Sequence, residues 1–309
     1  MKALVLILLT FSQYSIAATY LEKLCKDAII TIDGRSSQNL IKLYEGSSTF
    51  IFGKTRKNGN FITKLDNDEI KTLDQLDLKI HDLKESGDKL YALSNNSILV
   101  LDKLSLNELT IFKTSKDNIS LKHQRASEIE IIQDKIFIAH GSLGLIVLNK
   151  KTGEMVDHNE YSLPHKKGHI SRATGLAIWE DKILLAYDNV TYNYGSKKRA
   201  FEGLLVADLI TLEKIKTTSI NTRREALHEP SLDFVDGKLF SQNLHLIFEY
   251  DLNKLLKAKY FWPMKRRWFF DGHEIIGKPL LSNGKIRSCF KKYNSNLDTF
   301  SSRYFEVSL

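Results

Sequence analysis

The sequence predicts an all-β protein, a β-propeller of six blades with seven as the alternative. Three observations lead to this prediction. A short motif, in which a Lys opens an apolar run, recurs through the chain. The apolar runs are short and alternate with polar residues, which is typical of strands and not of helices. Most runs end on Asp or Asn, whose side chains start tight turns by accepting a backbone N–H two residues on.

The recurring motif sets the length of the repeat. Its copies GDKLYAL, QDKIFIA, EDKILLA, DGKLFSQ and IGKPLLS are spaced by 46, 47, 56 and 40 residues, counted between Lys89, Lys135, Lys182, Lys238 and Lys278. The longest interval contains the polar stretch 189–200, and a hairpin extension of about 12 residues there restores a spacing near 44. Repeats of this length with about four strands each indicate propeller blades.

The first repeat, residues 40–78, fits less well. Asn58-Gly59 lies between alternating runs and predicts a hairpin. Residues 65–78 are charged and fit either a helix or an outer strand. The last repeat begins near His273, and we expect the strand-like residues 28–32 to join it and close the ring.

The chain has two cysteines, Cys25 and Cys289. Ring closure by residues 28–32 would bring Cys25 close to the strand that carries Cys289. An even, minimal count permits one disulfide in an oxidising compartment, and two unpaired buried thiols are the alternative.

The N-terminus has the pattern of a secretory signal: Lys2, an apolar run over residues 3–11, and small residues at Ser15 and Ala17. We expect residues 1–17 to be removed and 18–309 to form one propeller domain in the periplasm or outside the cell. A membrane anchor is the alternative, but the apolar run is shorter than the roughly 20 residues that a spanning helix needs.

The net charge of the chain is +8, and Lys2 contributes one of these charges, so the mature chain carries +7. Such an excess favours weak association with anionic surfaces, including acidic glycans and lipid headgroups, without specific nucleic-acid recognition. We expect a monomer.

The segments LNKKTGEM and ADLITLEKI, together with DKLYAL followed by SILVLD, resemble the YVTN and quinoprotein-like propeller repeats of secreted bacterial proteins. The resemblance implies the propeller fold over most of the mature chain. Quinoprotein repeats usually place a Trp soon after the Thr-Gly turn, whereas Val156 and Asp157 follow TGEM here. The resemblance therefore implies no quinone cofactor and no catalytic residue.

The repeat also locates a candidate binding site. In a propeller the loops that lead into the innermost strands meet at one rim of the channel, and basic residues stand ten positions before the first four motif lysines. A ring of Arg and His there predicts a site for an anionic small molecule, glycan or protein segment. The alternative is that Arg125 and Arg172 make contacts between blades. The predicted rim residues are Lys79, His81, Arg125, Arg172, His228, Glu229, His273 and Glu274.

Two further features allow other functions. The basic and aromatic segment with Lys265, Arg266, Arg267 and Trp268 suits a membrane or glycan contact, unless its rings pack between blades and its basic triplet forms a solvated turn. Channel His and carboxylates could serve a hydrolase or lyase, with a divalent metal as an optional cofactor. The sequence contains no HExxH, CxxC or GxSxG motif, so we expect a binding protein without a cofactor. A scaffold for another envelope protein is the third alternative.

Overall fold

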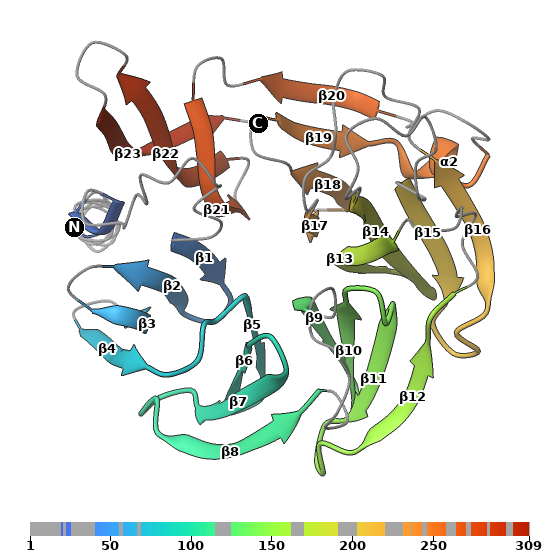
Figure 1. The fold of residues 1–309 in the computed structure, drawn as a ribbon, viewed down its shortest axis with the longest axis horizontal. Coiled ribbons are helices and arrows are strands. Elements are labelled where there is room, and N and C mark those ends of the chain that lie inside the picture. Colours follow the sequence, from blue (N-terminus) through green and yellow to red (C-terminus); the bar gives the residue numbers. More distant parts are fainter. Residues whose placement is uncertain are drawn as a thin grey trace, which may run out of the picture. The chain divides into compact units, whose positions relative to one another are not determined.

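The computed structural model shows an all-β propeller fold (Figure 1). It describes residues 20, 23–25, 41–55, 58–66, 69–114, 125–161, 170–190, 203–219, 231–235, 237–242, 246–257, 264–269, 273–282, 285–294 and 299–308. These residues form five four-stranded sheets and one three-stranded sheet, all antiparallel. Five complete blades are therefore described where six were predicted. Residues 28–32, which were expected to complete the last sheet, lie outside the described residues.

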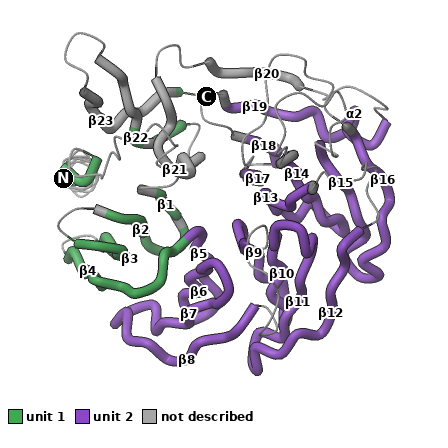
Figure 2. The backbone as a smooth tube through the Cα atoms, viewed as in Figure 1, with its two compact units in different colours: residues 1–80, 270–309 green, residues 81–269 purple. Residues whose placement is uncertain are grey.

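The chain divides into two compact units (Figure 2). Unit 1 comprises residues 1–80 and 270–309, and unit 2 comprises residues 81–269. The expectation of one propeller domain over residues 18–309 stays a prediction.

Unit 2 consists of four consecutive sheets, each an up-and-down run of four neighbouring strands. The strands are β5 (Asp82–Ser86), β6 (Lys89–Leu93), β7 (Ser97–Asp102) and β8 (Glu108–Lys113); β9 (Ala126–Ile132), β10 (Lys135–His140), β11 (Leu145–Asn149) and β12 (Met155–Asn159); β13 (Ile170–Trp179), β14 (Lys182–Val190), β15 (Gly203–Asp208) and β16 (Lys214–Ser219); and β17 (Ser231–Val235), β18 (Lys238–Gln242), β19 (Leu246–Tyr250) and β20 (Met264–Phe269). Each motif lysine of this unit begins the second strand of a sheet.

The two middle strands of each sheet are apolar because both of their faces are covered. In β6, Tyr91 and Leu93 pack in one core cluster with Ile129 and Ile138 of the following sheet. Leu90, on the opposite face of β6, is fully buried as well. Burial on both faces requires continuous apolar runs, whereas the half-exposed outer strands alternate.

Turns that start on Asp or Asn join the third and fourth strands, as predicted. Oδ1 of Asp102, Asn149 and Asp208 accepts the backbone N–H groups two and three residues further on. The fourth sheet departs from this pattern. There Asp251 caps a one-turn helix, α2 (Leu252–Leu255), by accepting the N–H of Lys254.

Unit 1 contains β1 (Ile41–Glu45), β2 (Thr49–Thr55), β3 (Gly59–Leu65) and β4 (Ile70–Leu76) in one sheet and β21 (His273–Ser282), β22 (Lys285–Asn294) and β23 (Thr299–Ser308) in the other. The predicted hairpin at Asn58-Gly59 joins β2 to β3, and Gly59 has a φ of 63°, which favours glycine. The charged segment 65–78 contains the outer strand β4, so the helix alternative was wrong.

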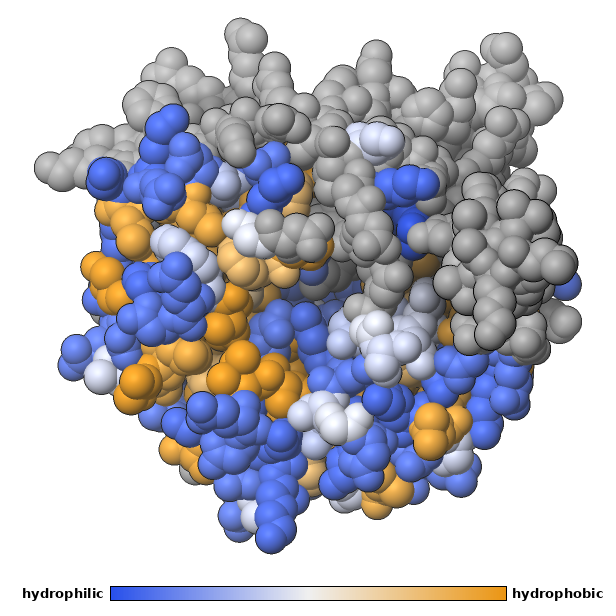
Figure 3. All heavy atoms as spheres, turned by 180° about the vertical axis from the view of Figure 1, so that it is seen from behind, coloured by the Kyte–Doolittle hydropathy of each residue, from blue (hydrophilic) through white to orange (hydrophobic). Residues whose placement is uncertain are grey.

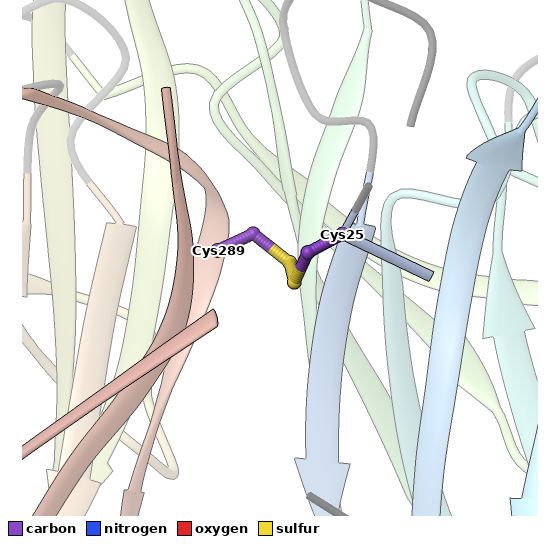
Figure 4. The surroundings of a disulfide bond; sticks show 2 residues. All are labelled: Cys25 and Cys289. Carbon is purple, nitrogen blue, oxygen red and sulfur yellow. A yellow bond between two sulfur atoms is a disulfide. The ribbon is translucent and has the colours of Figure 1, made fainter. Parts of the chain in front are cut away.

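The predicted disulfide lies in unit 1, between Cys25 and Cys289 of β22 (Figure 4). Their Cα atoms are 5.6 Å apart, and both residues are fully buried in a cluster with Leu24, Leu43 and Phe61. Strand β1 lies beside β21, so the first and last sheets of the chain are neighbours within this unit.

No helix among the described residues is long and apolar enough to cross a membrane. The expected signal segment 1–17 lies outside the described residues, as does most of the extension expected at 189–200, where only Asn189 and Val190 are described, as the end of β14.

Candidate interaction site on unit 2

Two equivalent backbone contacts align neighbouring sheets of unit 2. The N–H of Ala126, at the start of β9, donates to the carbonyl of Asn95 in the preceding sheet, at 3.1 Å. The N–H of Ala173, in β13, donates to the carbonyl of Gly141 in its preceding sheet, at 2.8 Å. Asn95 and Gly141 each stand six residues after a motif lysine, so the repeat register taken from the sequence holds in three dimensions.

These contacts define one end of unit 2, which we call the N-terminal rim. It is the end at which β5, β9 and β13 begin and at which the turns between β6 and β7 and between β10 and β11 lie. Arg125 and Arg172 directly precede Ala126 and Ala173. The structure therefore brings these two predicted residues to equivalent places on the same rim.

Arg172 makes a two-pronged ion pair with Asp188 in the adjacent strand β14. Its Nε donates to Oδ1 at 3.0 Å, and Nη2 donates to Oδ2. The Asp188 side chain is only 3% exposed and that of Arg172 is 22% exposed. Two parallel hydrogen bonds to a carboxylate are the geometry in which guanidinium binds most selectively.

Arg125 is half-buried, and its surroundings differ from those of Arg172 at one informative position. Asp188 stands six residues after Lys182, and the residue six after Lys135 is Gly141. The sheet β9–β12 therefore carries no side chain where the next sheet carries the carboxylate that holds Arg172.

His81 lies just before β5 and is almost fully buried. Its Nε2 is 2.6 Å from Oδ1 of Asn95, which accepts the hydrogen bond. Since the carbonyl of Asn95 also accepts from Ala126, His81 supports the turn that joins two sheets.

Buried carboxylates join the innermost strands below the rim. Oδ2 of Asp82 accepts the N–H of Ile129 in the next sheet, at 3.1 Å. Oε2 of Glu128, which is 2% exposed, accepts the N–H of Leu176 at 2.6 Å and the N–H of Leu232 at 3.1 Å. Further along the same strands, Lys84 and Glu130 form an ion pair at 2.8 Å.

His140 is the most deeply buried titratable side chain near the rim. It ends β10, is fully buried, and lies with Nε2 3.2 Å from Oγ1 of Thr114. Burial lowers the pKa of His140 to about 4, because a charged imidazolium would lose its hydration. A backbone hydrogen bond of His140 acts in the opposite direction and raises the pKa, and the charge of the nearby His158 lowers it further.

The other predicted rim residues belong to unit 1 or lie outside the described residues. Lys79 is half-buried before β5 and belongs to unit 1. His273 and Glu274 begin β21, also in unit 1, opposite Lys292 and Lys291. His228 and Glu229 lie outside the described residues.

The basic triplet occupies a strand and not a turn. Lys265, Arg266, Arg267 and Trp268 all belong to β20, the outermost strand of its sheet, so the alternative of a solvated turn was wrong. Arg266 is opposite Glu249, and Lys265 stands at a bulge between the pairs of Met264 and Arg266. Binding of a membrane or a glycan by this segment stays a prediction.

The outer surface of unit 2 exposes several large apolar side chains. Leu104 and Ile210, each two residues after the Asp that starts a turn, are 70% and 80% exposed. Figure 3 shows apolar residues reaching the surface among hydrophilic ones. Within the described residues, no group of three or more His, Cys, Asp or Glu is arranged to hold a metal ion.

Asp188 and Glu128 were missed by sequence reasoning. The signal that could have found them is the repeat itself, because Asp82 and Glu128 both stand seven residues before a motif lysine. Asp188 gives no such signal, since its equivalents are Asn95 and Gly141.

The sheets and their repeated contacts define the chain as a β-propeller. Among solved structures it is similar to BamB from Moraxella catarrhalis, with a TM-score of 0.52 and 12% identity over 86% of this chain and 85% of that one. Two computationally designed proteins also match, Ika4 with a TM-score of 0.37 and 16% identity over 55% of this chain and 89% of that one, and Ika8 with 0.41 and 10% over 88% and 98%.

No protein-family model and no curated protein matches the chain. At 12% identity, the similarity to BamB shows the fold alone. The propeller part of the resemblance seen in the sequence is confirmed, and membership of the YVTN or quinoprotein-like repeats stays a prediction.

Proposed function

We propose that this chain is an exported, non-enzymatic propeller that binds an anionic partner, an acidic segment of another envelope protein, at the N-terminal rim of unit 2. The observation that carries the proposal is the equivalent placement of Arg125 and Arg172 beside the contacts of Ala126 and Ala173. Export is supported by the predicted signal at residues 1–17 and by the disulfide, since such bonds persist in oxidising compartments.

Within the rim we assign the partner's carboxylate to Arg125. The ion pair of Arg172 with Asp188 shows how a guanidinium at this place holds a carboxylate. In the preceding sheet the position equivalent to Asp188 is Gly141, so the surroundings of Arg125 differ from those of Arg172 at this position. Arg172 would then support the rim, and Arg125 would contact the partner.

An extended segment fits this surface better than an enclosed small molecule. Strands β9, β13 and β17 meet at the carboxylate of Glu128, three residues beyond Arg125. Sites for small molecules are usually concave and bury most of the ligand. A basic rim is suited instead to a segment that lies across it, and the net charge of +7 expected for the mature chain would speed the encounter with an acidic one.

The test is binding of a fluorescently labelled decaglutamate peptide, measured by anisotropy at low salt. We compare the wild-type chain with Arg125→Ala and with Lys135→Ala, an exposed residue at the other end of the same sheet. Loss of one charge-assisted contact is worth about 1.5–3 kcal/mol, so Arg125→Ala should weaken binding about tenfold or more. Lys135→Ala should change it less than about twofold, because loss of an exposed charge acts only weakly.

Equal weakening in the two variants would mean that the peptide responds to net charge alone, and the rim assignment would fail. Absence of binding by the wild-type chain at any salt concentration would remove the proposed function itself. Matching far-ultraviolet circular dichroism of the three proteins establishes that they are folded alike.

A further inference from the structure

In each sheet of unit 2 the innermost strand (β5, β9, β13 or β17) is an edge strand. Such a strand pairs on one side only, so alternate N–H groups on its other side need an acceptor from elsewhere. Three of these N–H groups belong to Ile129, Leu176 and Leu232, and all three residues are buried. Each stands six residues before a motif lysine, so the three groups are equivalent.

In two of the three cases the acceptor is a carboxylate at the same place in the preceding repeat, and in the third it is not. Asp82 and Glu128 stand seven residues before their motif lysines, and each accepts the equivalent N–H of the following sheet. By this rule the residue at position 175 would accept the N–H of Leu232, but that residue is Gly175, which has no side chain. Glu128 accepts from Leu232 as well, across the intervening sheet.

The difference between Asp and Glu fits this double role. Asp82 has the shorter side chain and reaches one amide in the adjacent sheet. Glu128 has one more methylene, and a single oxygen of its carboxylate lies within hydrogen-bond distance of amides in two sheets. Charged acceptors form stronger hydrogen bonds to backbone N–H groups than neutral ones do.

We infer that Glu128 is the positioning residue that holds three consecutive sheets of unit 2 together. It accepts the N–H of Leu232 in place of a carboxylate at position 175, where the chain has Gly175. It fixes β13 and β17 against β9, and through them the places of the residues at the N-terminal rim. This role goes beyond the proposed function, because it concerns the scaffold and requires no partner.

The test is hydrogen–deuterium exchange of the full chain, resolved by amide with nuclear magnetic resonance. Glu128→Ala should speed exchange of the Leu176 and Leu232 amides by about tenfold or more and leave that of Ile129 unchanged, because Asp82 holds the latter. Asp82→Ala should do the reverse. Glu130→Ala, on the same strand, should leave all three amides as they are, since Glu130 pairs with Lys84.

A uniform rise over all three amides in Glu128→Ala, or an unchanged Leu232 amide, would overturn the inference. If Glu128→Ala does not fold, Glu128→Asp decides the matter. With the shorter side chain, as at Asp82, we expect the Leu176 amide to stay protected and the Leu232 amide to lose protection. Protection of both amides in Glu128→Asp would contradict the argument from side-chain length.

Discussion

At the scale of single residues, two arginines at equivalent places have different surroundings. Arg172 faces Asp188 across the β13–β14 pair, and the equivalent position in the preceding sheet is Gly141. Both arginines directly precede the residue whose backbone joins its sheet to the one before. The two arginines therefore differ in the residue that stands opposite them, Asp188 for Arg172 and Gly141 at the equivalent position for Arg125.

We expect the buried His140 to make the free energy of unfolding depend on pH. Its pKa is lowered by burial to about 4 in the folded chain, whereas an exposed His titrates near 6.5. At pH values between these two, the unfolded chain binds a proton that the folded chain does not. The free energy of unfolding should therefore be unaffected by His140 above about pH 6.5 and should fall by up to about 3 kcal/mol as the pH drops toward 4.

Urea unfolding between pH 4 and 7.5 measures this dependence. His140→Asn should flatten the slope in the window between about 6.5 and 4. His158→Asn, which replaces a more exposed histidine, should largely retain it. A slope that is the same in His140→Asn as in the wild-type chain would show that other groups cause it.

At the scale of elements, the outer strands β8, β12 and β16 each contain a bulge at an equivalent place, which was not predicted from the sequence. Leu109, Val156 and Ile215 are each skipped in the pairing of β8, β12 and β16 with their neighbours. A bulge twists an edge strand and interrupts its regular row of backbone groups, which protects it from pairing with other chains. The exposed apolar residue at each bulge therefore fits a structural role.

In the turn after β11, a glycine allows close packing against the neighbouring sheet. Gly153 has a φ of 74°, and a Cβ at this position would collide with the ring of Phe112 in β8. Gly87 has a similar φ of 66°, but a Cβ there would meet open space. Gly87→Ala should cost about 1 kcal/mol from backbone strain alone, and Gly153→Ala about 3 kcal/mol because the collision is added. Urea unfolding of both variants measures the difference, and equal losses would refute it.

Strand order and turn chemistry could be predicted from the sequence because both are local. The motif lysines mark the second strands, and Asp102, Asn149 and Asp208 start their turns as expected. Contacts between sheets could not be predicted, since Glu128 and Leu232 are 104 residues apart and only the folded chain brings them together. The repeat register placed Arg125 and Arg172 at equivalent ends of neighbouring sheets, as the structure has them, and their role in binding stays a prediction. Lys79, His273 and Glu274 belong to the other unit.

At the scale of the whole molecule, one covalent bond encloses most of the chain. Cys25 and Cys289 are 264 residues apart in sequence. In the chain-entropy model, a loop of this length restricts the unfolded chain by on the order of 5 kcal/mol. The bond also fills a buried cluster of unit 1 with Leu24 and Phe61.

Replacing both cysteines by serine should therefore lower the free energy of unfolding by several kcal/mol, with about 5 kcal/mol as the estimate. Thermal unfolding with and without a reductant checks this. The reductant should lower the midpoint of the wild-type chain and leave that of the double variant unchanged. Equal midpoints for the wild-type chain under both conditions would contradict a stabilising role for the bond.

The acidic partner that we propose should bind unit 2 at its N-terminal rim. Hydrogen exchange of the full chain with and without saturating decaglutamate peptide tests this directly. We expect slower exchange in residues 93–97, 125–129 and 139–145, which form the rim around Arg125. Protection confined to the opposite turns, residues 86–89, 103–107 and 133–135, or spread evenly over the chain, would contradict it.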